Sequence, residues 1–358
     1  MKPDLEQMLL QDPYSMEKAE KEAMLSEKLI ALTRHHDTNC KQYHAIVKYL
    51  NMDIENLRSY YDILPVPVRL FKEFELLSVP PDTIRKVMTS SGTGGSVSKI
   101  FLDSDNIRAQ SAVLAGLIAS FIGKTRLPMI ILDTKSVKKD RKMYAARGAG
   151  ITGFSIYGRD IFYALNENME LDQAGMQAYM TKHQDETILM FGYTFMIWKY
   201  VLCEMKKQAV RMPLNRAILF HTGGWKKLEA QAVDADAFRA QVREAFGNVS
   251  IHNQYGMAEQ LGSIFMECEY GHFHCSNYSD IIIRRAEDFS IQPTGQKGLA
   301  ELVSILPSSY PGHVLLTEDE GLILGEDDCP CGRKGKYFKI TGRVRQAEIR
   351  GCSDTYEG

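Results

Sequence analysis

The sequence predicts an α/β fold with a mixed sheet and an appended, smaller β-rich region. Apolar runs at 127–132 and 187–191 are typical of buried strands, and a helical segment follows each of them, as in a repeating strand–helix layer. From about residue 264 the pattern changes to short alternating strands separated by turns. The chain of 358 residues is long enough for several subdomains that share one large core.

The first part of the chain predicts helices. Residues 1–62 are rich in Glu, Lys, Leu and Ala, contain no glycine, and place apolar side chains at helical spacing. Pro65 and Pro67 then force an extended path that ends this region. A short helix is expected at 71–77 and a longer one at 106–121, which follows three polar residues that can cap it.

The remaining apolar runs predict strands. Two further strands of the strand–helix layer are expected at 216–220 and 249–252. The strands of the β-rich region are expected at 281–283, 299–304 and 313–317. The organisation that we expect is a helical segment at 1–62, an α/β core at 63–263, a β-rich subdomain at 264–341 and a hinge-like tail at 342–358.

Composition excludes several classes of function. The 43 basic and 45 acidic residues give a net charge of −2 without a long basic run, so general binding to nucleic acid or to anionic membranes is not expected. The N-terminus lacks the apolar region of a signal peptide, and the most apolar stretch, 111–123, is too short to span a bilayer. Seven unevenly spread cysteines do not suggest a disulfide framework, so a cytoplasmic location is expected.

A glycine- and hydroxyl-rich segment lies between two short apolar runs, at 89–99. Its glycines allow a sharp turn whose N–H groups converge, its hydroxyls add donors, and Lys99 adds a positive charge, which together suit a polyphosphate. It is not a Walker loop, because Gly-Lys-Ser/Thr is missing, and an ordinary surface turn is the alternative. The candidate phosphate-binding residues are Ser90, Ser91, Gly92, Thr93, Gly94 and Gly95.

Three further clusters follow predicted strands, where ligands of α/β sheets usually bind. Thr222, Gly223 and Gly224 would let a flat ring approach the backbone, or they form a plain tight turn. Tyr255, Gly256 and Glu259 place a ring, a close-approach glycine and a carboxylate within one turn of an expected helix start. That carboxylate could hold Mg²⁺ or merely favour the helix N-terminus. Asp319 could accept hydrogen bonds from a ribose and Arg343 could bind phosphate, unless both are solvated loop charges.

In order and spacing, these four clusters resemble the core motifs of the adenylate-forming superfamily of acyl- and aryl-CoA ligases, over roughly residues 60–355. The segments 65–72, 325–336 and 350–354 look more narrowly like the acyl-protein synthetases of bacterial bioluminescence fatty-acid reductases, and phenylacetate-CoA ligases are more distant. The resemblance implies the large N-terminal domain of an adenylate-forming enzyme, with the mobile C-terminal domain of full ligases essentially absent.

The resemblance also implies a role for each cluster. The loop from Ser90 to Lys99 would cradle the β- and γ-phosphates of ATP, and Glu259 would ligate Mg²⁺. The segment 222–224 would form a wall against adenine, with Tyr255 on its other face. Asp319 would bind the ribose hydroxyls, and Arg343 the ribose or the α-phosphate. The implied reaction is attack of a carboxylate on the α-phosphorus, which gives an acyl-adenylate and pyrophosphate.

The sequence departs from the superfamily pattern in three places. Ala258 replaces a threonine that touches the α-phosphate, and Gly94 replaces a hydroxyl residue. No lysine follows Lys339, so the adenylation lysine would come from elsewhere, with Lys99 or Lys226 as candidates. Cys352, in Arg-Gly-Cys-Ser-Asp, would take the acyl group as a thioester in such a synthetase. The alternative is a free terminal cysteine.

The other cysteines suggest a structural zinc. Cys329 and Cys331 form a tight pair, and Cys268 and His274 lie about sixty residues upstream, with His272 or Cys275 as substitute ligands. Reduced, partly buried cysteines are the alternative.

We therefore expect an ATP-dependent ligase that transfers an acyl group from a small fatty or aryl acid to Cys352, a carrier protein or coenzyme A. An acyl carrier, a reductase or a thioesterase would be its protein partner. A catalytically degenerate nucleotide-binding scaffold of an acyl-transfer complex is the second hypothesis, because Ala258 and the missing lysine favour it.

Overall fold

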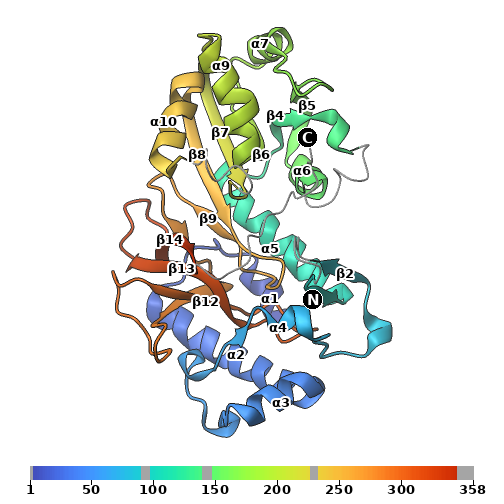
Figure 1. The fold of residues 1–358 in the computed structure, drawn as a ribbon, viewed down its shortest axis with the longest axis vertical. Helices are drawn as coiled ribbons and strands as arrows, with labels where there is room; N and C mark the ends of the chain where they lie inside the picture. The colour runs from blue at the N-terminus through green and yellow to red at the C-terminus, as the bar shows by residue number, and fades with distance from the viewer. Residues whose placement is uncertain (1–2, 90–96, 139–146, 226–232, 345–358) are drawn as a thin grey trace. The chain divides into compact units, whose positions relative to one another are not determined.

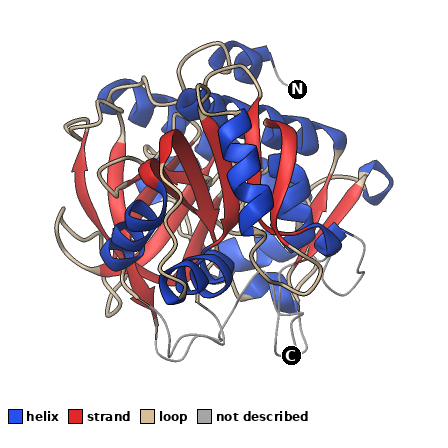
Figure 2. Cartoon of the chain, turned by 90° about the horizontal axis from the view of Figure 1, so that it is seen from above, coloured by secondary structure: helices blue, strands red, loops and turns tan. Residues whose placement is uncertain are grey.

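The computed structural model describes residues 3–89, 97–138, 147–225 and 233–344. The chain divides into two compact units (Figure 1). Of the described residues, those up to Phe121 and from Tyr255 onward form unit 1, and those between Ile122 and Gln254 form unit 2. Both units combine strands with helices that pack beside them, as Figure 2 shows in red and blue.

Unit 2 is built on a parallel sheet with the strand order β8-β7-β6-β4-β5. The central strands β4 and β6 are almost entirely buried, which explains why their sequences are largely apolar. Strand β7 exposes Asn215 and Arg216 near its start and is mostly buried from Ala217 to His221. The strands are β4 (Leu127–Thr134), β5 (Gly158–Leu165), β6 (Ile188–Tyr193), β7 (Leu214–Thr222) and β8 (Gly247–Tyr255).

Helices connect these strands. The bounds are α6 (Ala149–Ser155), α7 (Gln173–Lys182), α8 (Thr194–Met196), a π-helical turn η6 (Ile197–Leu202), α9 (Cys203–Lys207) and α10 (Ala235–Phe246), with the 3₁₀ turn η4 at Lys135–Lys138. The four strands expected in this layer are confirmed. Strand β5 was not predicted. It lies at the sheet edge, where Arg159 and Asp160 are exposed and 161–163 are half-buried.

Unit 1 contains an antiparallel sheet with the order β11-β12-β13-β14-β10-β9, and β1 pairs in parallel with β13. The three strands predicted in the β-rich region are β11, β12 and β13. The bounds are β1 (Val66–Pro67), β9 (Phe265–Glu267), β10 (Phe273–His274), β11 (Ser279–Arg284), β12 (Gly298–Ser304), β13 (Val314–Glu326) and β14 (Lys336–Arg343).

The predicted N-terminal helices are present, and the later helices differ mainly in length. Helix α5 begins after Asp103, whose carboxylate accepts a hydrogen bond from the Asn106 N–H at 2.8 Å and so caps it. Helix α4 ends at Glu73, because the backbone is extended from Phe74. Further along, the Ser78 N–H donates a hydrogen bond to the Ser309 carbonyl. The helices are α1 (Pro3–Met8), α2 (Lys18–Asn39), α3 (Lys41–Tyr49), α4 (Leu70–Glu73) and α5 (Ser104–Ile122). The 3₁₀ turns are η1 (Ile54–Asn56), η2 (Tyr60–Asp62) and η3 (Pro81–Thr83).

The core of unit 1 follows the two-residue period of its strands. Ile282 packs with Leu25 and Leu29 of α2 on one face of the sheet. Ile281 and Ile283, its neighbours on β11, belong to a second cluster with Phe265 and Phe338. Helix α2 therefore covers one face of this sheet, and aromatic residues fill the other.

A buried ion network joins α2 to this sheet. The Lys336 ammonium lies 2.7 Å from Asp280 Oδ2, and the Lys21 ammonium lies 3.7 Å from Asp280 Oδ1. The Tyr60 hydroxyl also donates to Asp280 Oδ2 at 2.6 Å, and Lys336 donates to the Tyr61 hydroxyl at 3.0 Å. All three charged side chains are at most 7 % exposed. Their contacts with one another therefore have to offset the free-energy cost of removing these charges from water.

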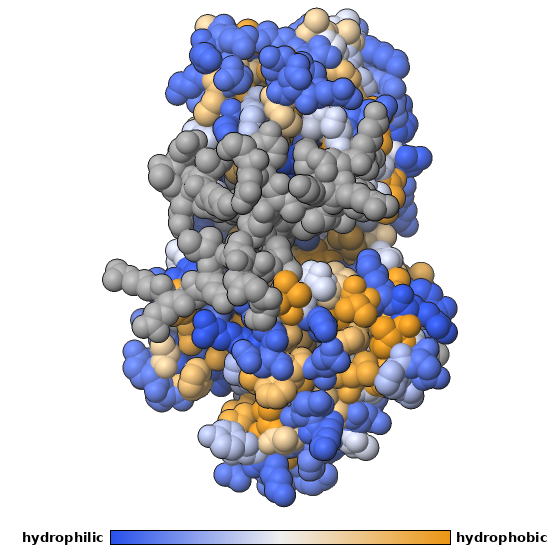
Figure 3. Space-filling model, turned by 45° about the vertical axis from the view of Figure 1, so that its right-hand side comes forward, coloured by the Kyte–Doolittle hydropathy of each residue, from blue (hydrophilic) through white to orange (hydrophobic). Residues whose placement is uncertain are grey.

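The hairpin of β2 (Lys86–Thr89) and β3 (Lys99–Leu102) is antiparallel, with Thr89 opposite Lys99. This confirms that the predicted phosphate loop joins two strands, although residues 90–96 themselves lie outside the described residues. Hydrophobic residues gather on the surface of unit 1 in Figure 3, and its exposed large side chains include Leu10, Phe74 and Val87. Among the described helices, none is long and apolar enough to cross a membrane.

Candidate functional site

Unit 1 brings together three of the residues predicted to bind a nucleotide. The Tyr255 hydroxyl, at the end of β8, donates to Asp319 Oδ2 at 2.7 Å. Arg343 Nε, at the end of β14, lies 3.0 Å from Asp319 Oδ1. The register of β13 and β14 places Asp319 directly opposite Arg343, so backbone pairing creates this contact.

A second carboxylate extends the cluster. Glu318 Oε2 lies 3.0 Å from Arg343 Nη2, and Glu318 Oε1 accepts a hydrogen bond from Arg69 Nε at 2.8 Å. These charge-assisted contacts hold Arg343 in a fixed orientation beside Asp319. Sequence reasoning missed Glu318 and Arg69 as parts of the site. Their signals were the acidic run 318–320 and the position of Arg69 in the segment 65–72.

The ring of Tyr255 packs against the aromatic face of the unit 1 core, with centroids 6.0 Å from Phe265 and 5.9 Å from Phe273. Burial raises the pKa of Tyr255 well above its ordinary value, and the charge of Asp319 raises it further. Tyr255 is therefore a neutral phenol that donates to Asp319. The carboxylate keeps further acceptor positions that could bind sugar hydroxyls.

The segment after Tyr255 forms turns instead of the expected helix. Gly262 has a φ of +85°, which a helix does not allow. Glu259 is only 2 % exposed, so its carboxylate lies inside unit 1. Burial raises the pKa of the Tyr310 phenol, and the charge of Glu259 contributes in the same direction.

Gly256 has no room for a side chain. A Cβ atom there would lie 2.5 Å from the Ser263 carbonyl oxygen, which is backbone and cannot rotate away. We expect Gly256→Ala to lower the free energy of unfolding by about 1–3 kcal/mol, measured by urea denaturation. Gly116→Ala in α5 is the control, because a Cβ there meets nothing within 4 Å. An equal stability of both variants would contradict the close approach.

Unit 2 presents its predicted residues at the carboxyl end of parallel strands. Thr222 ends β7, between Tyr193 of β6 and Gln254 of β8 in the register. Gly223 has a φ of +82°, and a Cβ there would lie 3.1 Å from the Tyr193 ring. Only glycine fits this turn, and it leaves the backbone accessible to a flat ligand.

His221 supports this turn from inside the sheet. Its Nδ1 lies 2.9 Å from Thr194 Oγ1, and the same hydroxyl donates to the Thr222 carbonyl at 3.2 Å. Burial lowers the pKa of His221 to about 3, so the imidazole is neutral at physiological pH. It acts as a structural hydrogen-bonding group beside the predicted adenine wall.

Of the other two predicted catalytic residues, Lys99 and Cys352, the structure describes only Lys99. Lys99 is half exposed on β3, and its ammonium lies 2.8 Å from Glu75 Oε1. Cys352 lies outside the described residues, as do the predicted phosphate-binding residues from Ser90 to Gly95.

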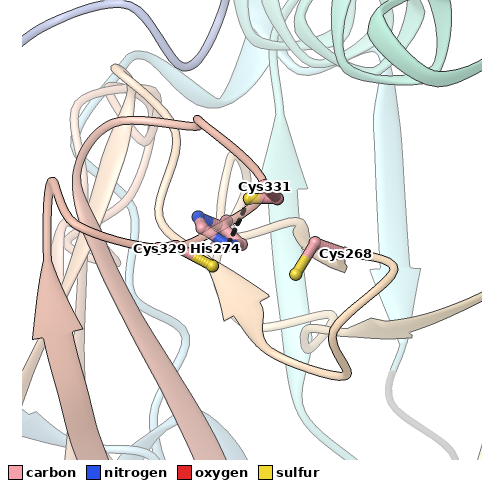
Figure 4. A group of neighbouring side chains, drawn as sticks. All are labelled: Cys268, His274, Cys329 and Cys331. Atoms are coloured by element: carbon pink, nitrogen blue, oxygen red, sulfur yellow. Dashed lines mark hydrogen bonds between the residues drawn. The ribbon is translucent and has the colours of Figure 1, made fainter.

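The four predicted metal ligands lie together in unit 1 (Figure 4). Their ligand atoms, the three Sγ atoms and one His274 nitrogen, all lie within 4.8 Å of one another, and Cys331 Sγ is 3.3 Å from His274 Nε2. Burial raises the pKa of Cys329 to about 12 and lowers the pKa of His274 to about 3. Of the two substitutes, Cys275 packs in the aromatic core cluster instead, whereas His272 Nδ1 lies 3.4 Å from Cys329 Sγ.

The fold is that of the large N-terminal domain of adenylate-forming ligases. The chain superposes on an open conformation of 2-hydroxyisobutyryl-CoA ligase, solved with 2-HIB-AMP and CoA, with a TM-score of 0.70. The two share 15% sequence identity, and the match covers 96% of this chain and 75% of that one. A second structure of this ligase, in the postadenylation state, gives a TM-score of 0.68. The predicted fold class is confirmed.

The chain belongs to the family of acyl-protein synthetases, LuxE, whose sequence profile matches residues 3–357. It is 23% identical over 357 residues to a long-chain-fatty-acid–luciferin-component ligase of Vibrio harveyi. The alignment covers 95% of this chain and 89% of the relative. The protein of the same name from Aliivibrio fischeri is 23% identical over 314 residues, 84% of this chain and 79% of the relative. The predicted class, an AMP-forming acid–thiol ligase of the acyl-protein synthetase type, is therefore confirmed.

Proposed function

We propose that this chain uses ATP to activate a long-chain fatty acid as its acyl-adenylate and then transfers the acyl group to a thiol. The observation that carries the proposal is the cluster of Tyr255, Asp319 and Arg343 in a member of the acyl-protein synthetase family. The names of the curated relatives favour a long-chain acid over an aryl acid.

In the first step, a carboxylate oxygen of the acid forms a bond to the α-phosphorus of ATP, and the bond to pyrophosphate breaks. We propose that Asp319 accepts hydrogen bonds from the ribose hydroxyls and that Arg343 stabilises the negative charge at the ribose or α-phosphate. In unit 2, Thr222, Gly223 and Gly224 would contact adenine through the open backbone of their turn. Positioning and neutralisation of charge would supply most of the rate.

Glu259 fits the Mg²⁺ that such a reaction requires. Its carboxylate is a hard oxygen ligand, and Mg²⁺ in nucleotide sites is commonly held by one or two carboxylates together with the phosphates. When bound, the ion would neutralise charge on the departing pyrophosphate. Burial keeps the Tyr310 phenol protonated, so it adds no competing negative charge.

In the second step, a thiolate attacks the acyl carbon, the new C–S bond forms, and AMP leaves. We propose Cys352 as this thiol, with a carrier protein or coenzyme A as further acceptors. A reductase, an acyl carrier or a thioesterase would then receive the acyl group. The exposed hydrophobic side chains of unit 1 support contact with a protein. The odd number of unevenly spread cysteines favours the reducing cytoplasm as the compartment.

Replacement of Asp319 tests the nucleotide site. We expect Asp319→Asn to raise the KM for ATP by about 10- to 100-fold in fatty-acid-dependent ATP–pyrophosphate exchange, because a charged hydrogen-bond acceptor is lost. Glu320→Gln is the matched control, since Glu320 is the next residue on β13 but pairs with Lys297 at 2.7 Å instead. An unchanged KM in Asp319→Asn would exclude this residue from the site.

The same assay separates the two functions that the sequence left open. A scaffold without turnover would bind ATP but catalyse no ATP–pyrophosphate exchange with any fatty or aryl acid that is tested. A ligase would exchange pyrophosphate with fatty acids and yield acyl hydroxamate when hydroxylamine is added.

A further inference from the structure

We infer that Cys268, His274, Cys329 and Cys331 form a structural zinc site in unit 1. Three sulfur atoms and one imidazole nitrogen are a ligand set that Zn²⁺ prefers. Cys268, His274 and Cys329 are buried, and Cys331 is half-buried. Four protein ligands leave no open coordination position, so the site would be structural and not catalytic.

The distances between the ligand atoms suit tetrahedral coordination of a zinc ion. With zinc–sulfur bonds of about 2.3 Å and a zinc–nitrogen bond of about 2.0 Å, neighbouring ligand atoms lie about 3.5–3.8 Å apart. The ligand atoms here lie within 4.8 Å of one another, and the pair Cys331 Sγ and His274 Nε2 is already at 3.3 Å. Shifts of well under an ångström in each side chain would complete the coordination.

Two similar turns present the thiols. Gly271 donates its N–H to the Cys268 carbonyl at 2.9 Å, and Gly332 does the same for the Cys329 carbonyl at 2.9 Å. Both glycines have a left-handed φ, +77° and +81°. Cys268 and Cys329 are thus each followed three residues later by a glycine that closes the turn. Such paired turns hold their thiols in place before any ion binds.

The neighbouring groups also suit a metal. His272 Nδ1, 3.4 Å from Cys329 Sγ, can donate a hydrogen bond to a thiolate, which is the kind of outer contact that orients metal ligands. His274 Nε2, which lies 3.3 Å from Cys331 Sγ, is the nitrogen placed to bind the ion. Arg333 Nη1 lies 3.0 Å from Glu269 Oε2 and links the two turns from outside.

The ion would join two parts of the sheet that are distant in sequence. Cys268 and His274 belong to the β9–β10 hairpin, and the thiols of Cys329 and Cys331 lie in the loop between β13 and β14. Since β10 already pairs with β14, with His274 opposite Tyr337, the ion would clamp this loop onto that edge. Binding would release the thiol protons to solvent and leave three thiolates on the metal.

The test is metal content of the full-length chain purified from zinc-supplemented cells, measured by plasma mass spectrometry. We expect one zinc per chain, retained on dialysis, and a lower melting temperature by several degrees after removal by a chelator. Replacement of zinc by Co²⁺ should give the absorption bands of tetrahedral thiolate coordination. Cys329→Ala should lose the metal, while Cys203→Ala, an exposed cysteine of unit 2, should keep it.

The Co²⁺ spectrum of the wild-type chain keeps the test decisive even if Cys329→Ala fails to fold. Cys275→Ala is a second control, since this thiol is adjacent to His274 in sequence but outside the ligand group. Zinc far below one per chain in the wild type, together with no thiolate bands after Co²⁺ addition, would overturn the site. Neither readout depends on ligase activity, so the proposed function could fail while this site stands.

Discussion

Replacing Asp280 with asparagine is expected to lower the free energy of unfolding by about 3–5 kcal/mol at pH 7. The substitution keeps the size of the side chain and removes its charge. Lys336 and Lys21 would then be buried beside a neutral amide, and a buried ammonium without a counter-charge is far more costly than the exposed ion in water. Chemical denaturation followed by circular dichroism measures the effect.

The dependence of this effect on pH follows from the pKa of Asp280. Burial alone would raise that pKa, but the Lys336 and Lys21 ammonium groups outweigh burial and hold it at about 2. Because the folded pKa lies below the ordinary value of 3.8, the carboxylate contributes its full stability above about pH 4. The stability difference between wild type and Asp280→Asn should therefore narrow as the pH falls from 4 towards 2.

An exposed ion pair is the matched control. Arg211 Nη2 and Glu244 Oε1 lie 2.9 Å apart with side chains 70% and 47% exposed, so Glu244→Gln should cost no more than about 1 kcal/mol. The double variant Asp280→Asn, Lys336→Met should recover part of the loss, because it removes one uncompensated charge. Equal small effects at both carboxylates would show that Asp280 is not enclosed with its lysines.

The second large effect is expected at Cys352. After incubation with ATP, Mg²⁺ and a mixture of fatty acids, intact-protein mass spectrometry should show one acyl adduct on the wild-type chain and none on Cys352→Ala. The reason is that the cysteine sulfur is the nucleophile that forms the thioester, and the methyl side chain of alanine carries no nucleophile. ATP–pyrophosphate exchange should continue in the variant, because formation of the acyl-adenylate precedes the thiol step.

Cys203→Ala controls for loss of an exposed thiol and should keep the adduct. An adduct that persists in Cys352→Ala would assign the acyl group to another residue. Exchange without an adduct in the wild type would instead point to a separate acceptor, and coenzyme A or a partner protein would then be added to find it.

Much of the fold was predictable, because the buried strands of unit 2 are continuous apolar runs. The edge strand β5 was not, since it pairs with β4 on one side alone and carries the exposed charged residues Arg159 and Asp160 near its start. The turn after Tyr255 was also wrongly predicted as a helix start. Glu259 and its neighbours have helical propensity, but Gly256 and Gly262 take up conformations that tertiary contacts require.

The candidate site was predictable as a set of residues but not as a set of contacts. Motif order singled out Tyr255, Asp319 and Arg343, yet their mutual hydrogen bonds depend on strand register, which motifs do not encode. The network around Asp280 gave no signal at all. Its members come from positions 21, 60, 280 and 336, and a lone lysine in an amphipathic helix is usually solvent-exposed.

The hairpin of β13 and β14 carries Asp319 and Arg343 at one end and the loop with Cys329 and Cys331 at the other. Irregularities in its pairing fall between these two ends, at 320–321 and 323–325. A single-residue deletion there would shift the pairing register on one side of the gap, so that Asp319 no longer lies opposite Arg343 or Glu326 no longer lies opposite Lys336 at the base of the loop. Loop grafts and domain fusions in this family should therefore leave the length of this ribbon unchanged.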